Sequence, residues 1–71
     1  MIQNQNKKKI IRDFEMMKSF EESTRNVYIK VHTDARVKDT EIQNTFKELA
    51  ADEQRHAEIV QEIINIIENA L

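Results

Sequence analysis

The chain has 71 residues, with 11 basic and 13 acidic side chains, a formal net charge of −2, and no cysteine, glycine or proline. This composition excludes disulfides, zinc fingers, iron–sulfur clusters, thiol nucleophiles and glycine-rich phosphate loops. The charge balance does not indicate nucleic-acid binding. No apolar stretch is long enough for a secretion signal or for a membrane span of about 20 residues. We therefore expect an all-helical, cytoplasmic protein that binds neither nucleic acid nor membrane.

The first predicted element is a long helix over about residues 8–36. It is preceded by a mostly polar segment, residues 1–6, that we expect to fray. Core positions recur at spacings of four and three for nearly four repeats, which is typical of a helix that buries one stripe. The apolar members are Ile10, Phe14, Met17, Tyr28, Val31 and Ala35. Glu21 and Thr24 occupy the two core positions in the middle of this series.

The second predicted element is a helix over about residues 39–70. Either Asp39, or Thr40 together with Gln43 in a capping box, fits its beginning. The apolar members of its series are Ile42, Phe46, Leu49, Val60, Ile63, Ile67 and Ala70. Glu53 and His56 interrupt the series. One continuous helix of about 60 residues is the alternative to a turn near Val37, because no glycine marks the end of the first helix.

Three polar residues interrupt the two apolar series at one height. If the chain folds back near Val37, Glu21 lies opposite Glu53, and His56 shares a helix face with Glu53 because the two are three residues apart. A carboxylate removed from water needs a cation, and no lysine or arginine occupies either series. Glu21, Glu53 and His56 are therefore predicted to bind metal. For His56 taken alone, a hydrogen-bonded core histidine is the alternative.

A single hairpin supplies only three ligands, and it leaves part of its apolar surface uncovered. Two copies would form a four-helix bundle whose four glutamates balance the charge of two divalent ions. The predicted fold is thus one all-α domain over residues 1–71, an antiparallel hairpin that dimerises into a four-helix bundle. The partner is expected to be a second copy, in a homodimer or a larger even-numbered oligomer. Carboxylate and imidazole ligands suit iron, manganese or zinc.

Two segments of the chain resemble the rubrerythrins, within the ferritin-like di-iron carboxylate proteins. Glu21, Arg25, Asn26 and Tyr28 match that family's Glu-x-x-x-Arg-Asn-x-Tyr run. Phe46, Ala50 and Glu53-Gln-Arg-His56 match its Phe-x-x-x-Ala-x-x-Glu-x-x-His run, and Asp52 begins the wider Asp/Glu-Glu-x-Arg-His signature. The resemblance covers roughly residues 14–60. Family members usually carry four helices in one chain, so here we expect two-fold symmetry to replace duplication.

The resemblance implies roles for individual residues. Glu21, Glu53 and His56 would hold two iron ions per dimer and act in catalysis through them. Asp52 would accept a hydrogen bond from His56 of a second copy, which fixes the imidazole tautomer. Tyr28 would hydrogen-bond a ligand carboxylate or carry an electron; a plain core aromatic is its alternative. Arg25 and Asn26 lie off the core positions and are predicted to be structural or surface residues.

The resemblance also implies a function, which is an oxidoreductase that oxidises Fe(II) or reduces O2 or peroxide with electrons from an external donor. Thr24 stands where rubrerythrins often add a carboxylate, which weighs against peroxidase chemistry of their kind. A metal-stapled dimerisation module without turnover is the alternative function, and a metal-free coiled-coil adaptor is a third.

Overall fold

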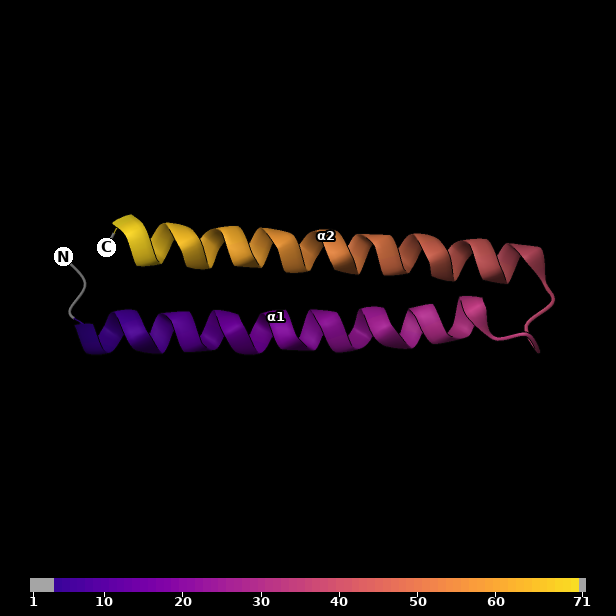
Figure 1. Ribbon diagram of the computed structural model, residues 1–71, viewed down its shortest axis with the longest axis horizontal. Coiled ribbons are helices and arrows are strands. Elements are labelled where there is room, and N and C mark those ends of the chain that lie inside the picture. The colour runs from indigo at the N-terminus through magenta and orange to yellow at the C-terminus, as the bar shows by residue number, and fades with distance from the viewer. Residues whose placement is uncertain (1–3, 71) are drawn as a thin grey trace.

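The computed structural model describes residues 4–70 and contains two antiparallel helices, as Figure 1 shows. Helix α1 spans Asn4–Thr33 and helix α2 spans Thr40–Ala70. They lie side by side in a rod of 53 × 15 × 11 Å. The predicted all-α hairpin is confirmed, and the single continuous helix is wrong. No helix in the described part of the chain is both long and apolar enough to cross a membrane.

The turn between the helices is held by local hydrogen bonds in place of a glycine. The Val37 amide donates to the Asp34 carbonyl over 3.0 Å, and the Asp34 carboxylate accepts from the Arg36 amide and guanidinium. Asp39 is the N-cap of α2, because its carboxylate accepts from the Ile42 amide over 3.0 Å. These bonds end α1 at Thr33, three residues before the expected limit. At its other end α1 begins at Asn4, so Asn4, Gln5 and Asn6 are helical although we expected them to fray.

The buried core belongs entirely to α2 within the described residues. Its members are spaced at intervals of three, four and seven, so they lie along one stripe of the helix; they are Ala50, Ala57, Val60, Ile64 and Ile67. This stripe is rotated from the predicted series, since Ile42 and Leu49 remain exposed. Because Ala50 and Ala57 are small, they allow α1 to approach closely on their side, and α2 turns that side toward its neighbour.

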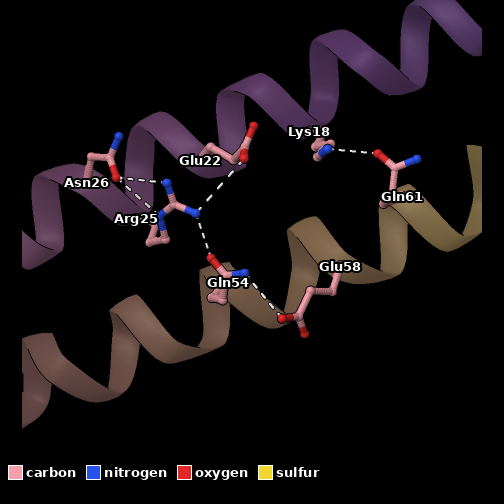
Figure 2. Close-up of polar contacts among 7 residues, drawn as sticks. All are labelled: Lys18, Glu22, Arg25, Asn26, Gln54, Glu58 and Gln61. Atoms are coloured by element: carbon pink, nitrogen blue, oxygen red, sulfur yellow. Dashed lines mark hydrogen bonds and ion pairs between the residues drawn. The ribbon is translucent and has the colours of Figure 1, made fainter.

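One long edge of the hairpin, which we call the polar edge, is closed by hydrogen bonds between the helices. Lys7 donates to the Glu68 carbonyl over 3.0 Å, Lys18 to the Gln61 amide oxygen over 2.7 Å, and Arg25 to the Gln54 amide oxygen over 2.6 Å. The last two bonds are drawn in Figure 2. The three bonds are distributed along the length of the hairpin, so side chains from both helices cover this edge.

The opposite edge is apolar and exposed, and we call it the open face. It comprises exposed side chains spaced three or seven residues apart on each helix: Met17, Phe20 and Val27 from α1, and Ile42 and Leu49 from α2. Contiguous apolar surface of this kind usually marks an interaction site. The hairpin therefore has one edge closed by its own polar side chains and one edge available to a partner.

Candidate metal centre

The structure brings Glu21, Glu53 and His56 together near the middle of both helices. One potential ligand atom from each lies within 4.8 Å of the others. The His56 Nδ1 atom is 3.6 Å from an oxygen of Glu21 and 3.8 Å from an oxygen of Glu53. The two interruptions of the apolar series thus meet at one height, with the imidazole beside both carboxylates.

The three side chains differ in how far they are covered. Those of Glu21 and Glu53 are 23% and 19% exposed between the helices, whereas that of His56 is 54% exposed. His56 lies on the same stripe of α2 as Ile42 and Leu49 of the open face, because the three residues follow one another at intervals of seven. The group is therefore backed by the hairpin and opens toward the exposed apolar edge.

The Glu21 carboxyl perturbs the neighbouring carboxyl of Glu53. The pKa of Glu53 is raised above its ordinary value, first because the Glu21 carboxyl hydrogen-bonds the protonated form of Glu53. Partial burial and the negative charges of Glu21 and Asp52 raise this pKa further, whereas His56 lowers it. Within residues 4–70, the ion pairs formed by Glu21 and Glu53 are with His56 alone. No lysine or arginine within residues 4–70 balances the negative charge of this pair of carboxylates, and a bound cation would balance it.

The distances within the group suit a shared ion. Oxygen and nitrogen ligands lie about 2.0–2.2 Å from a first-row divalent metal, so two ligands of one ion are at most about 4.4 Å apart. The two His56 separations fall inside that limit. His56 is therefore placed to share an ion with either glutamate.

A family model described as rubrerythrin matches residues 7–71. The chain belongs to the rubrerythrin family. Proteins of this family are generally oxidoreductases and typically bind iron. Comparison with curated proteins and with solved structures gives no significant match. The resemblance stated from the two sequence segments is confirmed, and the family match extends beyond both of them.

Asp52 on α2 and Tyr28 on α1, predicted to support the rubrerythrin-type ligands, both lie on the turn side of the ligand in their own helix. The Asp52 carboxylate is half exposed, one residue before Glu53, and pairs with Arg55 over 3.4 Å. The Tyr28 ring packs edge-on against Phe46, with ring centroids 5.7 Å apart, one heptad from Glu21 toward the turn. The predicted role of Asp52 is a hydrogen bond to a second copy, and that of Tyr28 is a hydrogen bond to a ligand carboxylate or the transfer of an electron. Both roles stay predictions.

Thr24 and Arg25, three and four residues after Glu21, form hydrogen bonds to different helices. The Thr24 hydroxyl donates to the Phe20 carbonyl over 3.0 Å, so this side chain bonds its own helix at the position where the resemblance would allow a further carboxylate. The Arg25 side chain is only 23% exposed and reaches across to α2. Core positions alone do not predict this cross-helix bond; the signal for it in the sequence is a long side chain one turn after a ligand.

Proposed function

We propose that two copies of this chain form a di-iron centre that oxidises Fe(II) or reduces O2 or peroxide. The observation that carries the proposal is the group of Glu21, Glu53 and His56, in which two adjacent carboxylates have no lysine or arginine partner among residues 4–70. Membership of the rubrerythrin family makes iron the first metal to test, and manganese or zinc would fit the same ligands.

Completion of the centre by a second copy follows from ligand number and charge. One hairpin provides two carboxylates and one imidazole, whereas two copies provide the four glutamates and two histidines of a ferritin-like di-metal site. Two divalent ions balance four carboxylate charges. The open face carries five exposed apolar side chains on the side of the hairpin where His56 lies, and a second hairpin packed there would cover them.

The chain's own residues have distinct parts in this centre. Glu21 and Glu53 hold the ions between the helices, and His56 adds a neutral ligand from the next turn of α2. Because its pKa is raised, the Glu53 carboxyl retains a proton more readily than an ordinary glutamate, and it releases that proton when a cation takes its place. The apolar side chains of the open face exclude bulk water. When bound, iron supplies cycling between Fe(II) and Fe(III), with electrons from an external donor.

Metal analysis of the purified protein alongside its mass in solution tests the proposal. We expect two ions per dimer, with binding abolished by Glu53→Gln or His56→Ala. Glu48→Gln is the matched control, because Glu48 is an exposed carboxylate of the same helix outside the group. Stoichiometric iron binding by both site variants would show that the assignment is wrong.

A metal-stapled dimerisation module is the second candidate function. It is favoured by the small core, since the described part of the hairpin buries only five apolar side chains. Anaerobic loading with Fe(II) followed by air separates the two functions. Growth of Fe(III) absorbance supports the oxidoreductase, whereas spectral silence, tight zinc binding and a melting temperature that falls with chelator support the staple.

A further inference from the structure

A network on the polar edge holds the Arg25 guanidinium from both helices. Its Nε and Nη2 atoms donate to the Asn26 side-chain oxygen over 3.1 and 3.0 Å, and its Nη1 atom donates to the Gln54 oxygen over 2.6 Å. Figure 2 draws these contacts as dashed lines. Glu22 lies 4.0 Å from the same guanidinium. The Gln54 amide nitrogen donates to Glu58 over 3.2 Å, which directs the Gln54 oxygen toward Arg25. Both partners of the cross-helix bond are therefore oriented by neighbours on their own helices.

The position of this bond connects it to the metal ligands. Arg25 lies one helical turn after Glu21, and Gln54 directly follows Glu53 along α2. Ala50 and Ala57 are the buried side chains on either side of Gln54, and their small, smooth surfaces fix axial register weakly. A slip of one residue would carry Glu53 about 1.5 Å along the helix relative to Glu21. A polar contact of defined geometry beside the ligands can hold the two carboxylates at the same height.

We propose that Arg25 is a positioning residue. Through its bond to Gln54 it sets the register of α1 against α2 at which Glu21 and Glu53 can share metal ions, and this role rests on the proposed function. Its bonds to other side chains go to amide oxygens, with Glu22 at the limit of an ion pair. Arg25 thus acts on the ligands through the backbones of the two helices. Residues that hydrogen-bond metal ligands typically alter metal affinity by about 10- to 100-fold when replaced, and we expect a shift in register at the ligands to act on the same scale.

The chain contains a matched control for this role. The Lys18 ammonium donates to Gln61, and both residues lie one heptad from Arg25 and Gln54 at equivalent helix positions (Figure 2). The two bonds join the same faces of the same helices, but on α2 Gln54 directly follows Glu53, whereas Gln61 lies eight residues after it. Loss of either bond should have a similar effect on helix pairing in general, so their difference isolates register at the site.

The experiment measures Co(II) binding to the full chain by titration and visible absorption for Arg25→Met and Lys18→Met. We expect Arg25→Met to weaken affinity by about 10- to 100-fold and to alter the ligand-field bands, with Lys18→Met within about threefold of the original chain. Arg25→Lys should restore part of the affinity through its remaining donor. Adding Gln54→Leu to Arg25→Met should cause little further loss, because the two changes remove one contact.

Two results would overturn the role of Arg25 while leaving the proposed function intact. One is Co(II) binding by Arg25→Met within about threefold of the original chain; the other is an equal loss in Lys18→Met. Equal melting temperatures of the two variants, read by circular dichroism, would show that any difference in affinity does not come from general unfolding. Failure of the original chain to bind Co(II), Fe(II), Mn(II) or Zn(II) would instead refute the proposed function, and the role of Arg25 with it.

Discussion

Phe20→Ala tests whether the open face is the surface that joins two copies. Phe20 is the most exposed large apolar side chain of the described residues, at 72%. Within one hairpin its replacement should therefore change the helix content and the thermal midpoint very little. If a second hairpin covers the open face, the same change removes apolar area from the centre of the interface and should weaken association.

The expected size of the effect follows from the exposed area. A phenylalanine has about 200 Å² of surface, so roughly 140 Å² of Phe20 is available to a partner. At about 25 cal/mol per Å² this area is worth about 3.5 kcal/mol, of which alanine would keep about a quarter to a third. Each dimer contains two copies of the change. The dimer should lose about 5 kcal/mol, which corresponds to three to four orders of magnitude in its dissociation constant.

Sedimentation equilibrium across a concentration series, with metal held constant, measures this constant. Ile29→Ala is the control, because Ile29 is also exposed, at 38%, but does not belong to the open face. It should leave the dissociation constant within about tenfold of the original. A Phe20→Ala chain that dimerises as tightly as the Ile29→Ala control would refute the assignment of the open face as the dimer interface.

Three further predictions concern stability. Because the pKa of Glu53 is raised, its carboxyl stabilises the metal-free fold below the ordinary glutamate value of 4.5, and that stabilisation is lost as the pH rises through the raised value. Glu53→Gln should remove this fall from melting curves recorded with chelator between about pH 4 and pH 8, and an unchanged fall would contradict the stated cause. Ile64→Ala should cost about 2–5 kcal/mol in urea unfolding, because Ile64 is 2% exposed; a loss under about 1 kcal/mol would contradict its place in the core. Lys7→Met should lower the melting temperature more at low salt than at high salt, since Lys7 caps the end of α2; a salt-independent loss would argue against a charge effect.

The hairpin and the proximity of Glu21 to Glu53 and His56 could be predicted from the alternation of fours and threes. This pattern determines which residues share a helix face and, with a turn near Val37, which residues lie opposite each other. It does not determine which part of a wide apolar arc meets the helix of the same chain. On α2 both Ala50 and Leu49 lie on that arc, and the alanines pack against α1 because of their small size.

The role of Arg25 lay outside a prediction based on core positions. A long side chain at the edge of a helix can reach its neighbour without occupying the core, and its destination depends on what the neighbouring helix offers there. Asn26 and Gln54 determine that destination, and the relation between Arg25 and Gln54 became visible only with the register of α1 against α2 in place. Polar contacts of this kind are therefore harder to infer from spacing than apolar ones.

The bond from Lys7 to the Glu68 carbonyl places the start of α1 beside the end of α2. A tandem gene fusion of two hairpins could therefore report how they pack. A linker of a few residues would allow only the arrangement in which both turns lie at the same end of the bundle. The opposite arrangement needs a connection running the 53 Å length of the rod, which takes about 16 extended residues. The shortest linker that preserves metal binding would thus reveal the relative orientation of the two hairpins.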